Sequence, residues 1–514
     1  MSETSPDAPS PASARRPAWR TFFRRLTLLA AAVLFLLAAA VLSAPKPPKP
    51  HAAEALAIDR VNVVDVRTGT LRTEQTVLID GGRIEAVGPT GFEIPSHYRR
   101  LDADGRFLIP GLLDMHAHWV TSLAPQVTMP LFLAHGVTGI RELGGDPSFA
   151  TKALWRDEVN AGRLLGPRTL SIASRVVNAL PSEDTAEAVE WVVNQAAERG
   201  GFVKVYNRLL PEHYEALVTS ARKRGVEVVG HRPAAISTVV AARAGQRSVE
   251  HARLFLFEAF TGADELRGRQ LARLRGEPVD GPMVDTALRR RMIDDFDPQL
   301  FEEITGAMVE NGMAYVPTHL TRKMDAFADD EAYRNDPRLR YIHFALRRYW
   351  HEDADGMVAE DPSPEGRQVF MDFYRRGLEL TGEAHRRGVL VLAGTDANDT
   401  YVFPGSSLHE ELGELVKAGL TPAEALRAAT LDPATFLGFG GELGHIDVGY
   451  RADLVLLRAN PLDDIAATAS IDAVVLGGAH YDRTALDALL KGVERGSSSV
   501  RLLLKYLADS AFAD

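Results

Sequence analysis

Two histidines separated by one residue are the first candidates for chemistry in this 514-residue chain. They are His116 and His118, and they stand at the end of the largely apolar run 108–115. In a β-strand, residues i and i+2 point to the same face, so both imidazoles would project from one strand end. Two imidazole nitrogens held in this way can bind one metal ion. The pair therefore predicts part of a metal site, although short pairs of this kind also occur by chance on protein surfaces.

Four further side chains that can bind metals or move protons lie in other apolar runs or just after them. They are Lys204, His231, His251 and Asp396. Each has a structural explanation when taken alone. Lys204 could be a surface lysine at a strand end, the histidines could be ordinary side chains, and Asp396 could cap a helix. These explanations weaken together, because chance would have to place every one of them at a strand end. The set favours a metal centre assembled from several strands.

The elements that must position these side chains alternate between strands and helices. Such alternation indicates parallel βαβ units. Eight units predict an α/β fold whose strands close into a TIM-type (β/α)8 barrel, and the reacting groups then lie at the carboxyl ends of the strands. We expect the eight strands at residues 109–114, 137–142, 169–173, 202–206, 226–230, 248–250, 314–317 and 389–393.

Several longer motifs accompany the candidate ligands. They are GVTGIRE at 136–142, VEH at 249–251, GTDA at 394–397 and GHIDVGYRADLV at 444–455. Together with the ordered ligands, they resemble the amidohydrolase superfamily of metal-dependent hydrolases, especially its imidazolonepropionase-like and prolidase-like members. The resemblance extends over residues 55–481. It is specific because the motifs occur together and in order, since each of them separately is weak.

The resemblance implies a centre with two divalent metal ions. His116, His118 and Asp396 would bind one ion, and His231 and His251 would bind the other. Zinc suits a set of imidazole and carboxylate ligands, and manganese or iron could also occupy such a site.

The resemblance also assigns a role to Lys204, because an ammonium group has no lone pair with which to bridge two metals. In this superfamily the matching lysine takes up carbon dioxide and becomes a carbamate that bridges them. A metal-bridging hydroxide would attack the substrate, and Asp396 would accept its proton and pass it to the leaving nitrogen. Tyr206 should face the same interior as Lys204 and could bind substrate, with barrel packing as the alternative. His319 follows the seventh expected strand and could contact substrate or solvent.

The resemblance implies hydrolysis of an amide-type C–N bond, and we expect the substrate to be a dipeptide, an N-acyl amino acid or a cyclic amide. A mononuclear hydrolase of the imidazolonepropionase or deaminase type is one alternative, and an esterase or lactonase is another. A catalytically inactive, membrane-anchored binding protein is less favoured, because all six ligands are present. Substrate carboxylates could be bound by arginines, although salt bridges explain most such residues; the candidates are Arg141, Arg175, Arg232 and Arg322.

The segments around the expected barrel indicate the domain organisation. The resemblance implies that residues 51–109 and 438–485 pair into a small β-sandwich domain beside a barrel at 110–437. Residues 258–298 and 322–365 follow the sixth and seventh strands and could form substrate lids or an outer helical layer. Residues 486–514 should form a helical tail.

Composition excludes several classes of protein. The chain has no cysteine, which excludes disulfides and thiolate metal ligands. The formal net charge is -11, and residues 1–50 carry a net +5, which leaves -16 for the remainder. An acidic body argues against nucleic acid as the main partner. The resemblance implies a small-molecule amide or peptide substrate instead. The oligomeric state stays open, a homo-oligomer included.

The first 50 residues predict a membrane anchor. A Ser-, Pro- and Ala-rich stretch at 1–16, expected to be disordered, precedes a basic segment, the apolar run 26–44 and a Pro-rich spacer at 44–50. The apolar run is just long enough to cross a bilayer. Its basic flank predicts a cytoplasmic amino terminus and an extracytoplasmic catalytic body, which is periplasmic if the protein is bacterial. Secretion after cleavage of a signal peptide is the alternative.

Overall fold

The computed structural model describes residues 18–119, 123–145, 147–181 and 183–511. The chain forms two compact units, which we describe separately. Residues 46–498 make up the larger unit, which contains both β-sheets, and the two chain ends make up the smaller one.

The larger unit contains a parallel sheet that nearly closes into a barrel. Seven strands lie side by side in chain order: β6 Leu112–Ala117, β7 Val137–Glu142, β8 Arg168–Val177, β9 Phe202–Val205, β10 Val228–Gly230, β11 Ser248–Glu250 and β12 Ala314–Val316. Residues 391–397 link the two edges, through parallel bridges of Val391 with Tyr315 and of Ala397 with Ala117. The predicted α/β barrel is therefore confirmed, with isolated bridges where the eighth strand was expected.

Gly394 explains how this last segment can approach β6 closely. A Cβ atom at Gly394 would lie 2.8 Å from the backbone nitrogen of His116, so no larger residue fits. On either side of it, Met115 N donates to Ala393 O at 2.9 Å and Asp396 N donates to His116 O at 2.7 Å. These backbone bonds fix Asp396 beside the first histidine.

The first expected strand, 109–114, is divided at Gly111. Strand β5 (Phe107–Pro110) belongs to a second sheet, and β6 begins at Leu112 in the barrel. Pro110 has no N–H to donate, which suits the last residue of a strand. A continuous apolar pattern does not show which sheet each half joins.

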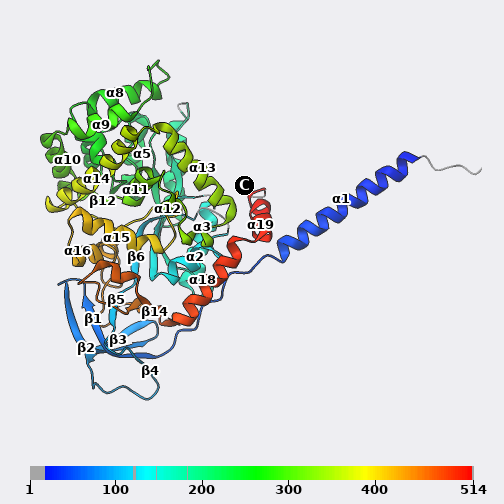
Figure 1. Cartoon of the computed structure of the whole chain (residues 1–514), viewed down its shortest axis with the longest axis vertical. Helices are drawn as coiled ribbons and strands as arrows, with labels where there is room; N and C mark the ends of the chain where they lie inside the picture. The colour runs from blue at the N-terminus through cyan, green and yellow to red at the C-terminus, as the bar shows by residue number, and fades with distance from the viewer. Residues whose placement is uncertain (1–17, 120–122, 146, 182, 512–514) are drawn as a thin grey trace, which may run out of the picture. The chain divides into compact units, whose positions relative to one another are not determined.

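The second sheet brings the two flanks of the barrel together. Its strand order is β15-β14-β13-β5-β1-β2-β3, with β4 also paired to β1. The join is antiparallel pairing of β13 with β5, in which Leu454 lies opposite Pro110. In Figure 1 this mixed sheet lies at one end of the larger unit and helices α8 and α9 lie at the other. Its strands are β1 Leu56–Asp65, β2 Thr70–Asp80, β3 Arg83–Pro89, β4 Arg99–Asp102, β5 Phe107–Pro110, β13 Leu454–Leu457, β14 Ile471–Leu476 and β15 Ala479–Asp482.

Helices connect the barrel strands and carry sequence signals at their ends. Helix α14 begins with Ser363, whose hydroxyl accepts from Gly366 N, and with Pro364 at its first turn. The helices are α2 Thr128–Ala134, α3 Phe149–Asn160, α4 Thr185–Glu198, α5 Pro211–Lys223, α6 Thr238–Ala244, α7 Leu254–Glu258, α8 Ala263–Leu274, α9 Thr286–Asp294, α10 Pro298–Glu310, α11 His319–Phe327, α12 Glu331–Arg334, η1 Pro337–Tyr341, α13 Phe344–Glu360, α14 Pro364–Arg386, α15 Ser406–Ala418, α16 Pro422–Ala428, α17 Leu431–Phe436, η2 Ile465–Ala469 and α18 Arg483–Ser497.

The smaller unit contains α1 (Ala18–Leu42) and α19 (Val500–Ala511). Within α1, residues 25–42 have a mean hydropathy of 2.4 and none of them is buried. By length and composition this helix could cross a membrane, and a signal sequence would have the same properties. The expected disordered stretch 1–16 lies outside the described residues.

Candidate metal centre

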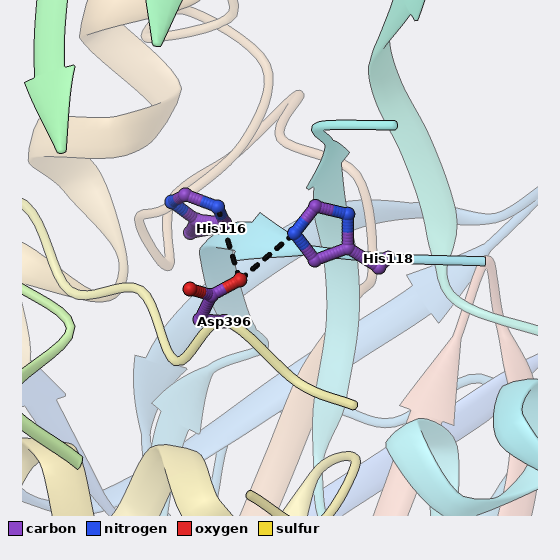
Figure 2. Close-up of side chains that lie close together, drawn as sticks. All are labelled: His116, His118 and Asp396. Carbon is purple, nitrogen blue, oxygen red and sulfur yellow. Dashed lines mark hydrogen bonds and ion pairs between the residues drawn. The ribbon is translucent and has the colours of Figure 1, made fainter. Parts of the chain in front are cut away.

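Three of the expected ligands meet at the carboxyl end of the barrel. His116 and His118 come from the end of β6, and Asp396 comes from the segment that closes the barrel (Figure 2). The Nε2 atoms of His118 and His116 lie 2.8 and 3.2 Å from Asp396 Oδ1. One ligand atom from each residue lies within 4.8 Å of the others. The alternation expected of a strand therefore does place both imidazoles on one side.

Two more histidines face this trio. The Nε2 atoms of His231 and His251 lie 2.7 Å apart, and His251 Nδ1 lies 3.5 Å from Asp396 Oδ2. Burial holds the pKa of both imidazoles well below its usual range, and the cationic groups around them add to this effect. Both rings are therefore neutral at pH 7, which is the form that binds a metal.

Asp396 remains an anion in this buried place. Burial acts to raise the pKa of its carboxyl group, but His116, His118 and His251 together hold that pKa well below its usual range. The backbone of Asp396 has φ +67° and that of His251 has φ +79°, in a region that only glycine adopts readily. Backbone strain of this kind is concentrated at functional sites.

Lys204 points into the barrel from β9. Its neighbours Val203 and Val205 belong to the main hydrophobic core, and Lys204 itself is buried. Its Nζ lies 3.4 Å from His116 Nε2. Burial lowers the pKa of the Lys204 amine, which increases the fraction that is neutral and nucleophilic.

Glu250 stands in the VEH motif and contacts the ring of His116, a role that its place in the sequence does not indicate. Its side chain is fully buried, and Oε2 accepts from His116 Nδ1 at 3.0 Å. Oε1 accepts from Arg141 at 2.9 Å and from the Ser248 hydroxyl at 2.6 Å. Burial acts to raise the pKa of Glu250, but Arg141 and His116 lower it to about 2. The carboxylate thus keeps the proton of His116 on Nδ1 and leaves Nε2 free for a metal.

Asp114 ties the two ligand-bearing segments together. Its Oδ1 accepts from the backbone N–H groups of His116 and Thr395, both at 3.0 Å, and its Oδ2 accepts from the Thr395 hydroxyl at 2.6 Å. Because these bonds are buried, they hold β6 and the GTDA segment in one register.

The six candidate ligands line a space of about 340 Å³, which we call the metal chamber, and it adjoins a larger cavity of about 1170 Å³. Four residues line both spaces: His231, His251, Arg253 and Arg322. The larger cavity is walled partly by α8, α9 and the loop between them, so the insertion after the sixth strand does border the site. Burial lowers the pKa of Arg253 to about 10, so its guanidinium stays charged at pH 7.

The two candidate substrate residues have different positions. Tyr206 lines the metal chamber and its ring lies against His231, with centroids 3.9 Å apart. His319 is fully buried at the start of α11 and lines neither space, and among the described residues neither ring nitrogen has a hydrogen-bond partner. The His319 side chain therefore lies in the interior, and Glu411 accepts a hydrogen bond from its backbone N–H at 2.9 Å.

Comparison with known proteins places the chain in a family. An imidazolonepropionase from Rubrobacter xylanophilus is 44% identical over 77 residues, which are 14% of this chain and 17% of that protein. An ochratoxinase from Aspergillus niger is 30% identical over 146 residues, which are 27% of this chain and 28% of that protein. These matches span less than a third of either relative.

Solved structures show the same fold. Bottromycin amidohydrolase has a TM-score of 0.63 at 24% identity, covering 90% of this chain and 94% of that chain. A Xaa-Pro dipeptidase with bound methionine has a TM-score of 0.57 at 19% identity, covering 84% of this chain and 100% of that chain. The model of the amidohydrolase family matches residues 107–480, which contain the whole barrel and part of both flanks. The chain therefore belongs to the amidohydrolase family.

Proposed function

We propose that this protein is a binuclear metal-dependent hydrolase of an amide-type C–N bond, with a dipeptide, an N-acyl amino acid or a cyclic amide as substrate. The single observation that carries the proposal is the convergence of six candidate ligands around one chamber. They are His116, His118, Lys204, His231, His251 and Asp396.

The donor set fits two divalent ions of the kind that zinc represents. Two imidazoles and a carboxylate meet on one side, two neutral imidazoles meet on the other, and Lys204 lies next to His116. Divalent ions bound there would activate a water molecule and polarise the scissile carbonyl group. The neutral amine of Lys204 would add to carbon dioxide and lose one proton, which gives a carbamate with two oxygens that can bridge.

The protein's own side chains supply the proton transfers and the orientation. Asp396 is ionised and lines the chamber beside His116, His118 and His251, so it can accept a proton from the attacking water and deliver it to the leaving nitrogen. Tyr206 lines the same chamber and can donate its hydroxyl hydrogen to a substrate oxygen. Glu250 holds His116 in the tautomer that binds a metal.

Metal analysis and a substrate panel test the proposal together. The protein prepared with zinc and bicarbonate should contain close to two metal ions per chain, and His116→Ala should contain fewer. It should hydrolyse members of a panel of dipeptides, N-acyl amino acids and cyclic amides. One tightly bound ion per chain, unchanged on adding zinc and bicarbonate, would favour a mononuclear centre. Turnover of esters or lactones alone would favour an esterase or lactonase.

We also propose that α1 anchors the protein in a membrane with the catalytic unit outside the cytoplasm. Its apolar, exposed segment at residues 25–42 supports this. The full chain should sediment with membranes, and a version lacking residues 1–50 should be soluble and active. A mature amino terminus just after Ala44 would show instead that the segment is a cleaved signal peptide.

A further inference from the structure

Arg253 is a charged side chain that lacks a protein partner. Within the part of the chain that the structure describes, its guanidinium forms no hydrogen bond and no ion pair, and the side chain is partly buried. A guanidinium has five N–H donors and is costly to bury without acceptors. An unpaired cation in this position indicates a site for an anion that the protein itself does not supply.

Three other buried or half-buried arginines have carboxylates close by. Arg322 pairs with Asp325, Arg141 with Glu250 at 2.9 Å, and Arg232 lies 3.5 Å from Glu258. The charged and titratable groups that act most strongly on Arg253 are Arg322, Tyr206, Asp325 and Arg232. These three carboxylates lie beside other arginines, and among the described residues no carboxylate lies within ion-pair distance of the Arg253 guanidinium.

Arg253 also lies where a substrate must pass. It borders the metal chamber together with His231 and His251, and it borders the larger cavity as well. It stands two residues after His251 and directly before α7, whose Phe257 lines the larger cavity. A ligand group bound by Arg253 would therefore lie beside the metal ligands, with space in both directions.

We propose that Arg253 binds a carboxylate of the substrate and thereby selects acidic substrates that also carry a bulky apolar group. This inference rests on the proposed function and names the substrate class for the same site. A guanidinium can hold a carboxylate through two parallel hydrogen bonds, which fixes the orientation of the scissile bond as well as the charge.

The larger cavity supports the apolar part of the proposal. Its volume of about 1170 Å³ exceeds what a small dipeptide fills. One part of its wall is apolar and comes from four different elements or loops. The residues are Leu254, Phe257, Leu274, Met283, Phe370 and Phe373. An aromatic or long aliphatic acyl group, or a large apolar side chain, suits this wall.

A matched pair of compounds tests the role of Arg253. N-benzoyl-L-phenylalanine and its carboxamide have nearly the same shape, and only the first carries a charge. We would measure the dissociation constants of both by calorimetry on the metal-loaded protein, and their hydrolysis separately. The wild type should prefer the acid by roughly 10- to 100-fold, which is the range for a hydrogen-bonded charge. Arg253→Gln should lose this preference, and Arg253→Lys should keep part of it.

Two controls separate binding from folding. Arg224→Gln removes the same charge from an exposed pair with Glu190 that lines neither cavity, and it should keep the preference. Arg253→Gln should keep the wild-type Tm or raise it, because no internal partner of Arg253 is lost. Metal content should equal that of the wild type in both variants.

Three results would overturn the inference: equal binding of acid and carboxamide by the wild type, no binding of either compound, or a preference that survives in Arg253→Gln. The proposed function is judged separately, from metal content and from turnover of the wider panel. If the panel is hydrolysed without preference for acids, the hydrolase assignment stands and the role of Arg253 is wrong. If metal and turnover are both absent while Arg253 still discriminates in binding, the role of Arg253 stands and the hydrolase assignment is wrong.

Discussion

Replacing Glu250 with glutamine tests whether this buried carboxylate controls the metal centre. Glu250→Gln preserves shape but exchanges one acceptor oxygen for an NH₂ donor. In the wild type, one oxygen of Glu250 accepts from His116 and the other accepts from Arg141 and Ser248. Whichever way the amide turns, its NH₂ group faces a donor. It confronts either the Nδ1–H of His116 or the guanidinium of Arg141.

The structure allows the size of the effect to be worked out. Facing Nδ1, the amide would force the His116 proton onto Nε2, the atom that points at Asp396. That tautomer cannot bind a metal through Nε2, so metal affinity should fall about 10- to 100-fold. Facing Arg141, the amide would leave a guanidinium without its counter-ion where the side chains are 1% and 0% exposed. Breaking a buried ion pair costs about 3–5 kcal/mol in free energy of unfolding.

Two assays follow the two consequences. Competition with a fluorescent zinc chelator measures metal affinity, and urea unfolding of the metal-free protein measures stability. Ser248→Ala is the matched control, because it removes a neutral neighbour of Glu250 and Arg141 while the ion pair of Arg141 and the bond from His116 to Glu250 stay in place. It should cost about 1–3 kcal/mol and leave metal affinity near the wild-type value. Wild-type affinity and wild-type stability in Glu250→Gln would refute the reasoning.

Other predictions concern the metal-bridging role of Lys204, the proton transfer by Asp396 and the loss of stability in acid. Lys204→Ala should lose turnover and at least one metal ion in elemental analysis, and normal turnover would contradict the bridging role. Asp396→Asn keeps one oxygen but removes the base, so kcat should fall about 10²- to 10⁴-fold with little change in KM; near-full kcat with both metals bound would mean that another residue carries the proton. Burial lowers the pKa of His409 to about 3. Between pH 6.5 and 3 this imidazole is therefore protonated in the unfolded chain but neutral in the folded protein. The free energy of unfolding should therefore decrease as the pH is lowered from 6.5 to 3, by up to about 1.4 kcal/mol per pH unit for this group. His409→Gln should reduce that slope in urea titrations at several pH values, and an unchanged slope would contradict the assignment.

The barrel could be predicted largely from local patterns. Apolar runs separated by helical stretches indicate parallel strands, and six of the eight expected strands begin or end within a few residues of the observed ones. The exceptions are the first, divided at Gly111, and the last, which forms isolated bridges at Val391 and Ala397. Both lie where the barrel meets or closes against another segment, so their assignment depends on long-range pairing.

The residues of the candidate site could be predicted from the sequence, but the side chains that hold them in place could not. The spacing of His116 and His118 predicts a shared direction because a strand alternates. No local pattern indicates that Glu250, 134 residues beyond His116, would hold its Nδ1 proton. In the same way, nothing local turns His319 into the interior, since Glu411 reaches its backbone from α15.

The amino-acid sequence indicates the kind of chemistry, because donor types at strand ends and their order along the chain are local properties. Which charges are neutralised depends on folding. Four arginines looked like candidates for binding a carboxylate, and three of them, Arg141, Arg232 and Arg322, have carboxylates close by. Arg253, which was not among the candidates, has none in the described structure. Ion pairing depends on distances of a few ångströms between groups far apart in the sequence, and only folding sets those distances.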